Sequence, residues 1–187
     1  MARCFGDGNP LYERYHDEEW GFAVRDERGL YERLSLEAFQ SGLAWITILR
    51  KREAFREAFS GFDPEIVAGY GVREVERLLG DVGIVRNRAK IEATIANAQA
   101  TLALREAGTP LRELFWSFAP PTPAEPAESL YDLPATTPES VSLAKALKAA
   151  GFRFVGPTTA YAAMQACGVV NDHLAGCEVR ARAAAAR

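Results

Sequence analysis

The sequence predicts an all-α protein that folds as one domain. Apolar residues recur at helical spacing along most of the chain, whereas no segment of useful length alternates apolar with polar residues as a strand would. Capping residues and prolines at helix starts, and glycines at helix ends, divide the chain into a series of short helices. A chain of 187 residues is long enough to bury a hydrophobic core.

The composition excludes several classes of protein. Hydrophobic residues at 48% and charged residues at 25% are the proportions of an average globular protein. No apolar run reaches about 18 residues and no signal-peptide pattern is present, so we expect no membrane contact and a cytoplasmic location. Three cysteines fit a reducing compartment better than a disulfide framework. A net charge of -3 argues against a non-specific nucleic-acid coat protein, but it leaves room for a local basic patch.

Two helices are expected in the first third of the chain. Over residues 28–41, Leu30, Leu34 and Ala38 recur at helical spacing. A second helix is expected over residues 46–60, with its leucine and phenylalanines facing inward and a run of basic residues facing outward.

Capping signals and glycines mark the next elements. Asp63 and Pro64 are a cap followed by proline at the first helical position, which predicts a short helix. Residues 72–107 are interpreted as a helix, a glycine-bearing turn and a long helix that Gly108 ends. A further short helix is expected over residues 111–118.

The last third begins with a proline-rich connection. Residues 119–137 and the proline that follows them hold six of the ten prolines, so we expect an irregular segment. Pro138 restarts a helix that Gly151 ends, and Pro157 starts another. Residues 179–187 have helix propensity but no apolar stripe, which predicts a flexible tail.

The chain places its few histidines and two of its cysteines at its two ends. Cys4 and His16 lie in a segment rich in Gly, Asp, Asn and Pro, while His173 and Cys177 are spaced to share a helical face or a turn. Two thiolates and two imidazoles form a closed tetrahedral zinc site of the structural type. On spacing alone, buried cysteines and hydrogen-bonded histidines remain the favoured interpretation, as for Cys167 in its apolar segment.

The turn "DVGIVRNRAK" at residues 81–90 has features of a phosphate-binding site. Gly83 can adopt a positive φ, and the unpaired amides at the start of the next helix can bind an anion. Arg86, Arg88 and Lys90 follow where a DNA phosphate would approach. A plain helix–turn–helix corner with solvated arginines is the favoured alternative on the local signal.

Four blocks of sequence together resemble one enzyme family. These are "YHDEEWG" (15–21), "LEAFQSGLAWITILRKR" (36–52), "GIVRNRAKI" (83–91) and "GFRFVGPTTAYAAMQACGVVNDH" (151–173). In this order they resemble the 3-methyladenine DNA glycosylase I family, over nearly the whole chain except the proline-rich connection and the tail.

The resemblance implies a fold and a metal. It implies a helix-hairpin-helix DNA glycosylase fold, with residues 72–107 as the hairpin element and an irregular N-terminal segment. A structural zinc ion would tie residues 1–25 to residues 170–178. Its ligands match Cys4, His16, His173 and Cys177.

The resemblance also implies a reaction. The protein would be a monomeric, monofunctional DNA repair enzyme that flips 3-methyladenine out of double-stranded DNA and hydrolyses its N-glycosidic bond. This lesion carries a positive charge and leaves as a neutral purine, so it needs little activation. No aspartate stands in the slot that related glycosylases use for catalysis, and Asp172 is expected instead to cap or support the chain near His173.

Four residues match the family's base-binding positions. Trp45, together with Tyr12 or Tyr15, would stack on the flipped base, and a ring face gains about 1–3 kcal/mol per stacked base. Glu37 would accept a hydrogen bond from the exocyclic amine and favour a cationic base. Glu37, Tyr15 and Trp45 would be the catalytic residues. The ordinary alternatives are core packing for the aromatic residues and a solvated helix acid for Glu37.

Seven residues are expected to approach DNA. The loop at Gly42 and Leu43 would supply a wedge that fills the gap left by the flipped nucleotide. The remaining expected contacts are Gly83, Val85, Arg86, Arg88 and Lys90.

One departure and three alternatives remain open. The family usually has a tryptophan shortly after its first cysteine, where this chain has Phe5; either Phe5 takes over its packing or the pocket is more open. The alternatives to a 3-methyladenine glycosylase are a broader N3-alkylpurine glycosylase, a non-catalytic DNA-lesion binder and a zinc-stapled helical interaction module.

Overall fold

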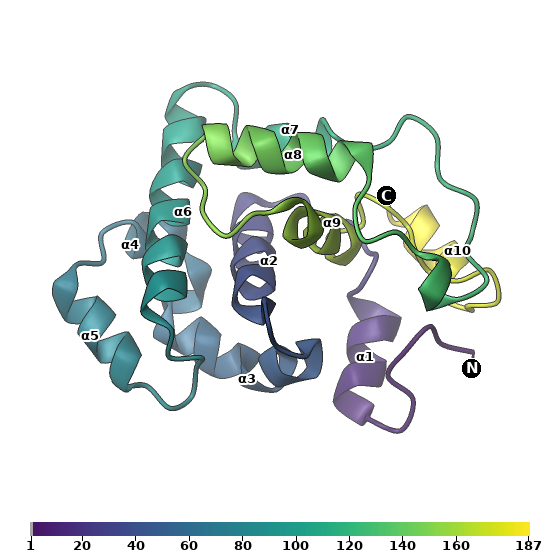
Figure 1. Ribbon diagram of the computed structural model, residues 1–187, viewed down its shortest axis with the longest axis horizontal. Coiled ribbons are helices and arrows are strands. Elements are labelled where there is room, and N and C mark those ends of the chain that lie inside the picture. The colour runs from purple at the N-terminus through teal and green to yellow at the C-terminus, as the bar shows by residue number, and fades with distance from the viewer. Residues whose placement is uncertain (1) are drawn as a thin grey trace.

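The computed structural model describes residues 2–187, and within them it is all-helical with no β-strand (Figure 1). The all-α prediction is therefore confirmed. Two single-turn 3-10 helices occur at Ser60–Phe62 and Leu130–Asp132. The α-helices are α1 (Pro10–Glu18), α2 (Glu27–Gln40), α3 (Trp45–Ala58), α4 (Pro64–Val67), α5 (Val72–Gly80), α6 (Arg88–Glu106), α7 (Leu111–Trp116), α8 (Pro138–Ala149), α9 (Pro157–Ala166) and α10 (Arg180–Ala185).

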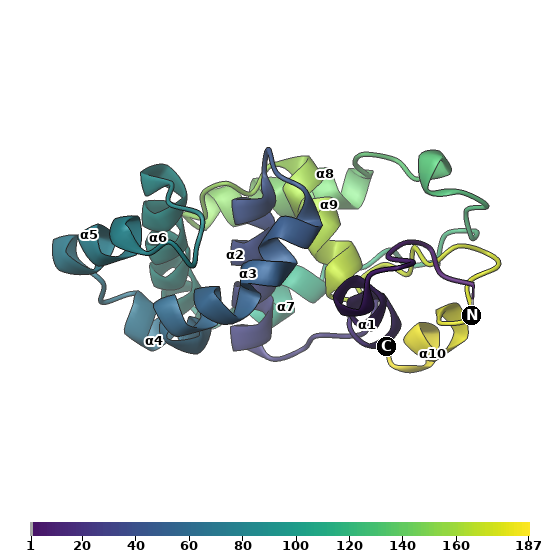
Figure 2. The same cartoon turned by 90° about the horizontal axis from the view of Figure 1, so that it is seen from below.

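Helix α2 lies at the centre of the molecule and packs against α3, α6, α7 and α9 (Figures 1 and 2). Leu30, Tyr31, Leu34 and Phe39 on this helix are completely buried, as a central helix requires. Asp26 caps its start by accepting a hydrogen bond from the Gly29 amide at 2.7 Å. The predicted helices at 28–41 and 46–60 correspond to α2 and α3.

The N-terminal segment contains a helix that the sequence analysis did not anticipate. Asn9 caps α1 by accepting from the Tyr12 amide at 3.2 Å, and Pro10 occupies the first helical position. These two residues are a start signal present in the sequence. The expectation of an irregular segment holds only for the residues on either side of α1.

The predicted flexible tail differs from the structure. Residues 180–185 form α10, and Val179 and Ala183, four residues apart, are completely buried. Arg182 donates to the Asp17 carbonyl at 2.7 Å, and Arg187 donates to the Val169 carbonyl at 2.5 Å. The buried side of this helix consists of one valine and one alanine, which is too few apolar residues for the sequence pattern to indicate a packed helix.

Both chain ends lie at the same end of the molecule, beside α1 and α10 (Figures 1 and 2). The Glu178 amide donates to the Ala2 carbonyl at 3.4 Å, so the first and last segments are in direct contact. Among residues 2–187, no helix combines the length and the apolar character needed to cross a bilayer.

Candidate base pocket and metal cluster

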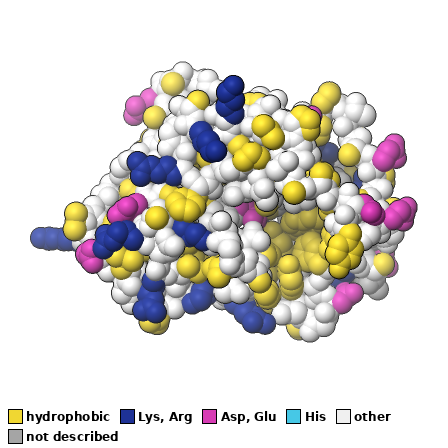
Figure 3. Space-filling model, viewed as in Figure 1, with side chains coloured by type: hydrophobic (Ala, Val, Ile, Leu, Met, Phe, Trp, Pro, Cys, Tyr) yellow, Lys and Arg dark blue, Asp and Glu magenta, His cyan; other side chains and the backbone are white. Residues whose placement is uncertain are grey.

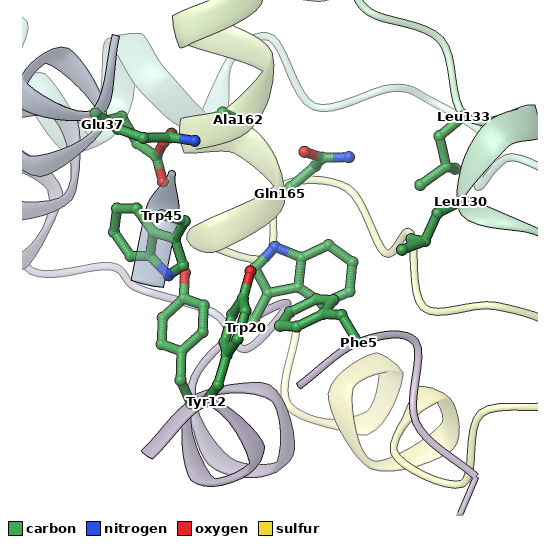
Figure 4. A pocket seen from close by; sticks show the side chains of 11 residues that line it. Phe5, Tyr12, Trp20, Glu37, Trp45, Leu130, Leu133, Ala162 and Gln165 are labelled. Atoms are coloured by element: carbon green, nitrogen blue, oxygen red, sulfur yellow. The ribbon is translucent and has the colours of Figure 1, made fainter. Parts of the chain in front are cut away.

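A cavity of about 240 Å³ opens between α1, the end of α2, the start of α3 and α9. Figure 3 shows it as a hollow with hydrophobic side chains on its walls. Most Lys and Arg side chains on this face lie to the left of the hollow or below it. The cavity is lined by Phe5, Tyr12, Tyr15, Trp20, Glu37, Gln40, Trp45, Leu130, Leu133, Ala162 and Gln165 (Figure 4).

The four residues expected to bind the base all line this cavity. Tyr12 and Tyr15 are three residues apart on α1, so the helix presents both rings on one side, with centroids 6.5 Å apart. Trp45 begins α3, and its ring lies 5.3 Å from that of Tyr15. Glu37 comes from the last turn of α2, and Figure 4 shows its carboxyl group directed into the cavity.

Glu37 is a buried carboxyl group without a protein partner. Its side chain is 6% exposed, and it forms no hydrogen bond or ion pair with any residue in the described part of the chain. Burial raises the pKa of Glu37 to about 8, and the Arg33 guanidinium opposes this only partly. The group is therefore largely protonated in the empty pocket at neutral pH. A cationic ligand would favour its ionised form.

The aromatic groups also leave polar atoms unpaired. Nε1 of Trp45 is buried without a partner, and neither the Tyr12 nor the Tyr15 hydroxyl bonds to another residue among those described. Buried polar groups in folded proteins are nearly always paired. Of these groups Nε1 of Trp45 is the buried atom, and it indicates a ligand that supplies the missing partner.

A partly buried ion-pair network lies behind Tyr15, and the sequence analysis missed it. The guanidinium carbon of Arg33 lies 5.7 Å from the Tyr15 ring centroid. Arg33 donates to Glu19 at 2.7 Å, and Arg52 donates to both oxygens of Glu19 at 2.5 and 2.8 Å. These contacts fix the wall against which Tyr15 packs. No local motif marks residues that meet from three separate elements.

Phe5 occupies the pocket at the position where the sequence departs from the family pattern. Its ring centroid lies 4.9 Å from that of Tyr12 and 5.0 Å from that of Trp20. Of the two alternatives, replacement of the tryptophan packing by Phe5 agrees with these contacts. The other lining residues that the sequence analysis missed are Trp20, Gln40, Leu130, Leu133, Ala162 and Gln165.

The four predicted metal ligands form one cluster. The ligand atoms of Cys4, His16, His173 and Cys177 all lie within 4.8 Å of one another. The Sγ–N distances are 3.6 Å from Cys4 to His173, 3.5 Å from Cys177 to His16 and 3.5 Å from Cys177 to His173. Zinc bonds of about 2.3 Å to sulfur and about 2.0 Å to nitrogen would place S and N about 3.5 Å apart in a tetrahedron. The donor set therefore fits a metal ion of this kind.

The second ring nitrogen of each histidine is held by an acceptor. Nδ1 of His16 lies 2.8 Å from the Asp17 carboxylate, and Nε2 of His173 lies 2.9 Å from the Trp20 carbonyl. This pattern leaves Nε2 of His16 and Nδ1 of His173 as the ligand atoms. His173 and Cys177 are joined by a turn rather than a helix.

The loop between α2 and α3 is exposed at the rim of the helical core. Leu43 is 41% exposed, and Gly42 has a φ of 82°, which favours glycine. Leu43 thus has the exposure that a wedge requires.

The predicted phosphate-binding turn joins α5 to α6 with some differences from expectation. Arg86 and Arg88 are exposed, and Arg88 pairs with Glu76 at 2.7 Å. Gly83 does not adopt a positive φ, but an added Cβ would be crowded, lying 2.9 Å from Oδ1 of Asp81 and 3.0 Å from the Cβ of Ala54. Val85 packs against the core.

The side chain of Lys90 does not face solvent. Its predicted role as a DNA contact therefore does not agree with the structure. The side chain is 7% exposed, and Nζ donates to the carbonyl oxygens of Phe39 at 2.9 Å and Ser41 at 2.6 Å. These are unpaired carbonyls at the end of α2, where a positive charge is favourable.

Helices α8 and α9 are joined by a loop over residues 150–156 (Figure 1). The amides of Thr158 and Thr159 in the first turn of α9 have no partner among the described residues, and the Gly156 cap offers no side chain. Arg153 in the preceding loop is exposed. Gly156-Pro157 was recognised as a helix start but not as an anion-binding feature.

The sequence and the structure both match known proteins. A family model described as methyladenine glycosylase matches residues 5–181. DNA-3-methyladenine glycosylase 1 of Escherichia coli (strain K12) is 48% identical over 179 residues, which is 95% of this chain and 96% of the relative. DNA-3-methyladenine glycosylase of Haemophilus influenzae is 43% identical over 168 residues, 89% of this chain and 91% of the relative.

Solved structures agree over a similar length. A crystal structure of 3-methyladenine DNA glycosylase I superposes with a TM-score of 0.91 at 49% identity, covering 95% of this chain and 98% of the other. A structure of the Staphylococcus aureus enzyme, described as showing the basis of 3-methyladenine recognition, superposes with a TM-score of 0.89 at 35% identity and covers 95% of each chain.

Proposed function

The chain belongs to the methyladenine glycosylase family, and from this membership and its pocket we propose that it excises 3-methyladenine from alkylated DNA. It is a DNA repair enzyme that hydrolyses the N-glycosidic bond. The observation that carries this proposal is Glu37, a buried carboxyl group without a protein partner in an aromatic pocket. Such a group suits a flat, cationic ligand with a hydrogen-bond donor.

Charge selects the lesion from normal bases. At an effective dielectric constant of about 20, opposite charges 4 Å apart attract by about 4 kcal/mol. Ionising Glu37 at pH 7 from a pKa of about 8 requires about 1.4 kcal/mol. The attraction exceeds this cost, so a cationic base favours the Glu37 carboxylate. A neutral base gains nothing comparable.

Stacking positions the base. The rings of Tyr12, Tyr15 and Trp45 line the same cavity and would attract a cationic purine through their π-electrons. We assign Glu37, Tyr15 and Trp45 to contact with the reacting base. When the bond between C1′ and N9 breaks, its electron pair neutralises the base, and water adds to C1′ with loss of a proton. The leaving group is already activated, so the protein mainly extrudes, orients and holds it.

DNA would lie across the face that carries the pocket. Leu43 is suited to fill the gap left by the extruded nucleotide. Two helix starts, α6 with Arg86 and Arg88 and α9 with Arg153, offer amides and basic side chains for the phosphates. Phosphate contacts of this kind fix register without reading sequence.

Zinc is the metal that best suits the cluster. Cys4, His16, His173 and Cys177 would hold it, and it would supply structural closure rather than an open catalytic position. The cluster adjoins the pocket through Phe5, whose ring lies 4.9 Å from that of His16. Ordering the N-terminal segment therefore also orders part of the pocket wall.

Release of free base from methylated duplex DNA tests the proposal. The wild-type protein should free 3-methyladenine and leave abasic sites without nicking the strand. Glu37→Gln should free it more slowly while keeping its metal and its fold. A protein that binds abasic DNA but frees no base would instead be a lesion binder. A protein with no DNA affinity even at low salt would be a zinc-stapled interaction module.

A further inference from the structure

Gln165 is a pocket residue whose amide group is held in one orientation. It lines the cavity from α9, and its Nε2 donates to Oδ2 of Asp172 at 2.8 Å. A carboxylate only accepts hydrogen bonds, so the NH₂ end of the amide must face Asp172. Figure 4 shows the amide oxygen on the side of Glu37 and the nitrogen on the side of Leu133. The carbonyl oxygen of the Gln165 amide is therefore available to the pocket as a hydrogen-bond acceptor.

Asp172 is itself held from behind the pocket wall. It is 9% exposed, and the Tyr161 hydroxyl donates to the same oxygen at 2.5 Å. Tyr161 is 5% exposed, and both residues line a separate cavity of about 90 Å³. Burial, together with this hydrogen bond, raises the pKa of Tyr161, so the hydroxyl remains a donor. Tyr161 and Gln165 thus both donate to the same carboxylate oxygen of Asp172, which holds the Gln165 amide in one orientation.

We propose that Gln165 identifies the exocyclic group of the flipped base, and that Asp172 and Tyr161 are positioning residues which fix its carbonyl oxygen toward that group. This inference rests on the proposed function. The Gln165 oxygen would accept from the N6 amine of 3-methyladenine. It would face the O6 carbonyl of 3-methylguanine as a second acceptor. The result is preference for adenine-type over guanine-type lesions.

Glu37 supplies an attraction that the two lesions share. Both N3-methylated purines carry a positive charge, so attraction to a carboxylate serves either base. With a cationic base bound, Glu37 is ionised and only accepts hydrogen bonds, so its carboxylate also favours an amine over a carbonyl at the exocyclic position. Gln165 would add a second acceptor, neutral and held in one orientation by Asp172. Gln165 therefore contributes to the choice between the two lesions and not to charge selection.

Two substitutions test the proposal through the ratio of kcat/KM for 3-methyladenine to that for 3-methylguanine, measured in methylated duplex DNA. Gln165→Met keeps the side-chain length and removes the acceptor, and it should lower the ratio by about tenfold, mainly through slower release of 3-methyladenine. Asp172→Asn allows the Gln165 amide to turn its NH₂ group to the pocket. This variant should lower the ratio by raising the release of 3-methylguanine relative to 3-methyladenine.

Gln40→Met is the matched comparison. Gln40 lines the same cavity, but its side chain has no hydrogen-bond partner among residues 2–187 and is free to turn toward either base. Its substitution should change both rates in the same proportion and leave the ratio as in the wild type. Zinc content and thermal unfolding should remain as in the wild type for the Gln165 and Asp172 variants.

An unchanged ratio in folded Gln165→Met and Asp172→Asn proteins would overturn the proposal, because a purely structural amide would affect both substrates alike. If Gln165→Met fails to fold, Asp172→Asn still decides the matter. The ratio of Kd values for the two free bases gives the same comparison without turnover. A wild-type protein that frees no base would refute the proposed function. The assignment of Gln165 would still be tested by the ratio of Kd values, and an unchanged ratio would refute it.

Discussion

At the scale of single residues, the pocket depends on a carboxyl group kept away from water and from protein donors. Glu37 is 6% exposed, and burial raises its pKa to about 8. In the unfolded chain the same group ionises near pH 4.5. The ligand-free fold is therefore less stable at neutral pH than it would be with a neutral side chain at this position. Here function and stability oppose each other.

Glu37→Gln should raise the stability of the ligand-free protein at pH 7. The buried acid keeps its full contribution below about pH 4.5, and this contribution is lost as the pH rises toward the folded-state pKa of about 8. At pH 7 the loss is about 3 kcal/mol, on the order of 1.4 kcal/mol per pH unit. Thermal unfolding at pH 5 and pH 7 measures the difference. The exposed Glu106→Gln is the control, and equal gains at both pH values would contradict the assigned pKa.

For single residues, the sequence predicts which side chains carry the chemistry of the site better than it predicts which side chains are buried. Tyr15, Glu37 and Trp45 lie within the long matching blocks, Tyr12 lies three residues before the first block, and all four line one cavity. Lys90 was misplaced because its partners are carbonyl oxygens at the end of another helix. Gln165 carries no motif of its own, since its role depends on Asp172 fixing its amide.

At the scale of elements, Lys90 links the start of α6 to the end of α2. Its ammonium group serves as a cap for carbonyls that would otherwise lack partners, directly before the Leu43 loop. The turn before α6 is also tied to α3, because Lys51 donates to the Val82 carbonyl at 2.9 Å. The expected wedge and the expected phosphate-binding turn are therefore parts of one packed unit.

Lys90→Met should lower the free energy of unfolding by about 2–3 kcal/mol, since two hydrogen bonds to a charged group are lost and two carbonyls are left unpaired. Chemical denaturation measures this change. The exposed Lys148→Met on α8 provides the control and should have little effect. A loss no larger than that of the control would mean that water replaces the ammonium group without cost.

The two candidate phosphate-binding helix starts can be separated by salt dependence. Arg86→Ala precedes α6 and Arg153→Ala precedes α9, and each phosphate contact contributes about 0.9 to the slope of log K against log salt. Loss of a real contact should reduce that slope by about one and weaken binding to all duplexes alike. Fluorescence anisotropy across salt concentrations measures both variants. If the slope of log K against log salt is unchanged in either variant, the helix that follows that arginine does not contact the DNA phosphates.

Elements with strong apolar periodicity were predictable, and those defined by a few tertiary contacts were not. The helices around residues 28–60 appeared nearly where expected because their buried positions recur regularly. Helix α1 was missed although Asn9 and Pro10 are a capping residue and a proline typical of a helix start. Helix α10 is held by contacts to distant residues such as Asp17 and Val169, which the local sequence does not reveal.

At the scale of the whole molecule, the metal cluster joins the two ends and supports one wall of the pocket. Phe5, Tyr12 and Tyr15 all belong to the N-terminal segment that the cluster holds. The prediction of a structural metal depended on four residues that no short spacing connects. Only the resemblance over the whole chain favoured it, and the Sγ–N distances of 3.5–3.6 Å now agree with it.

Removal of the metal with a strong chelator should lower Tm and abolish base binding while most helices persist. The reason is that binding free energy of about 10–16 kcal/mol holds the N-terminal segment, which supplies part of the pocket wall, against the C-terminal turn. Metal analysis, circular dichroism and binding of 3-methyladenine measure the three effects. Cys4→Ser should reproduce them, and Cys167→Ala, outside the cluster, should retain its zinc. Full base binding by a metal-free protein would contradict the link between cluster and pocket.

The contact between Cys4 and the His173–Cys177 turn has a further consequence for the denatured protein. If the ion stays bound when the helices melt, nearly the entire polypeptide becomes a ring. Closing a large loop removes conformational entropy from the disordered ensemble, by about 4–5 kcal/mol for loops of a hundred residues or more. A holo chain would then refold from a cyclic coil and an apo chain from a linear one, so the order of metallation and folding decides which route is taken.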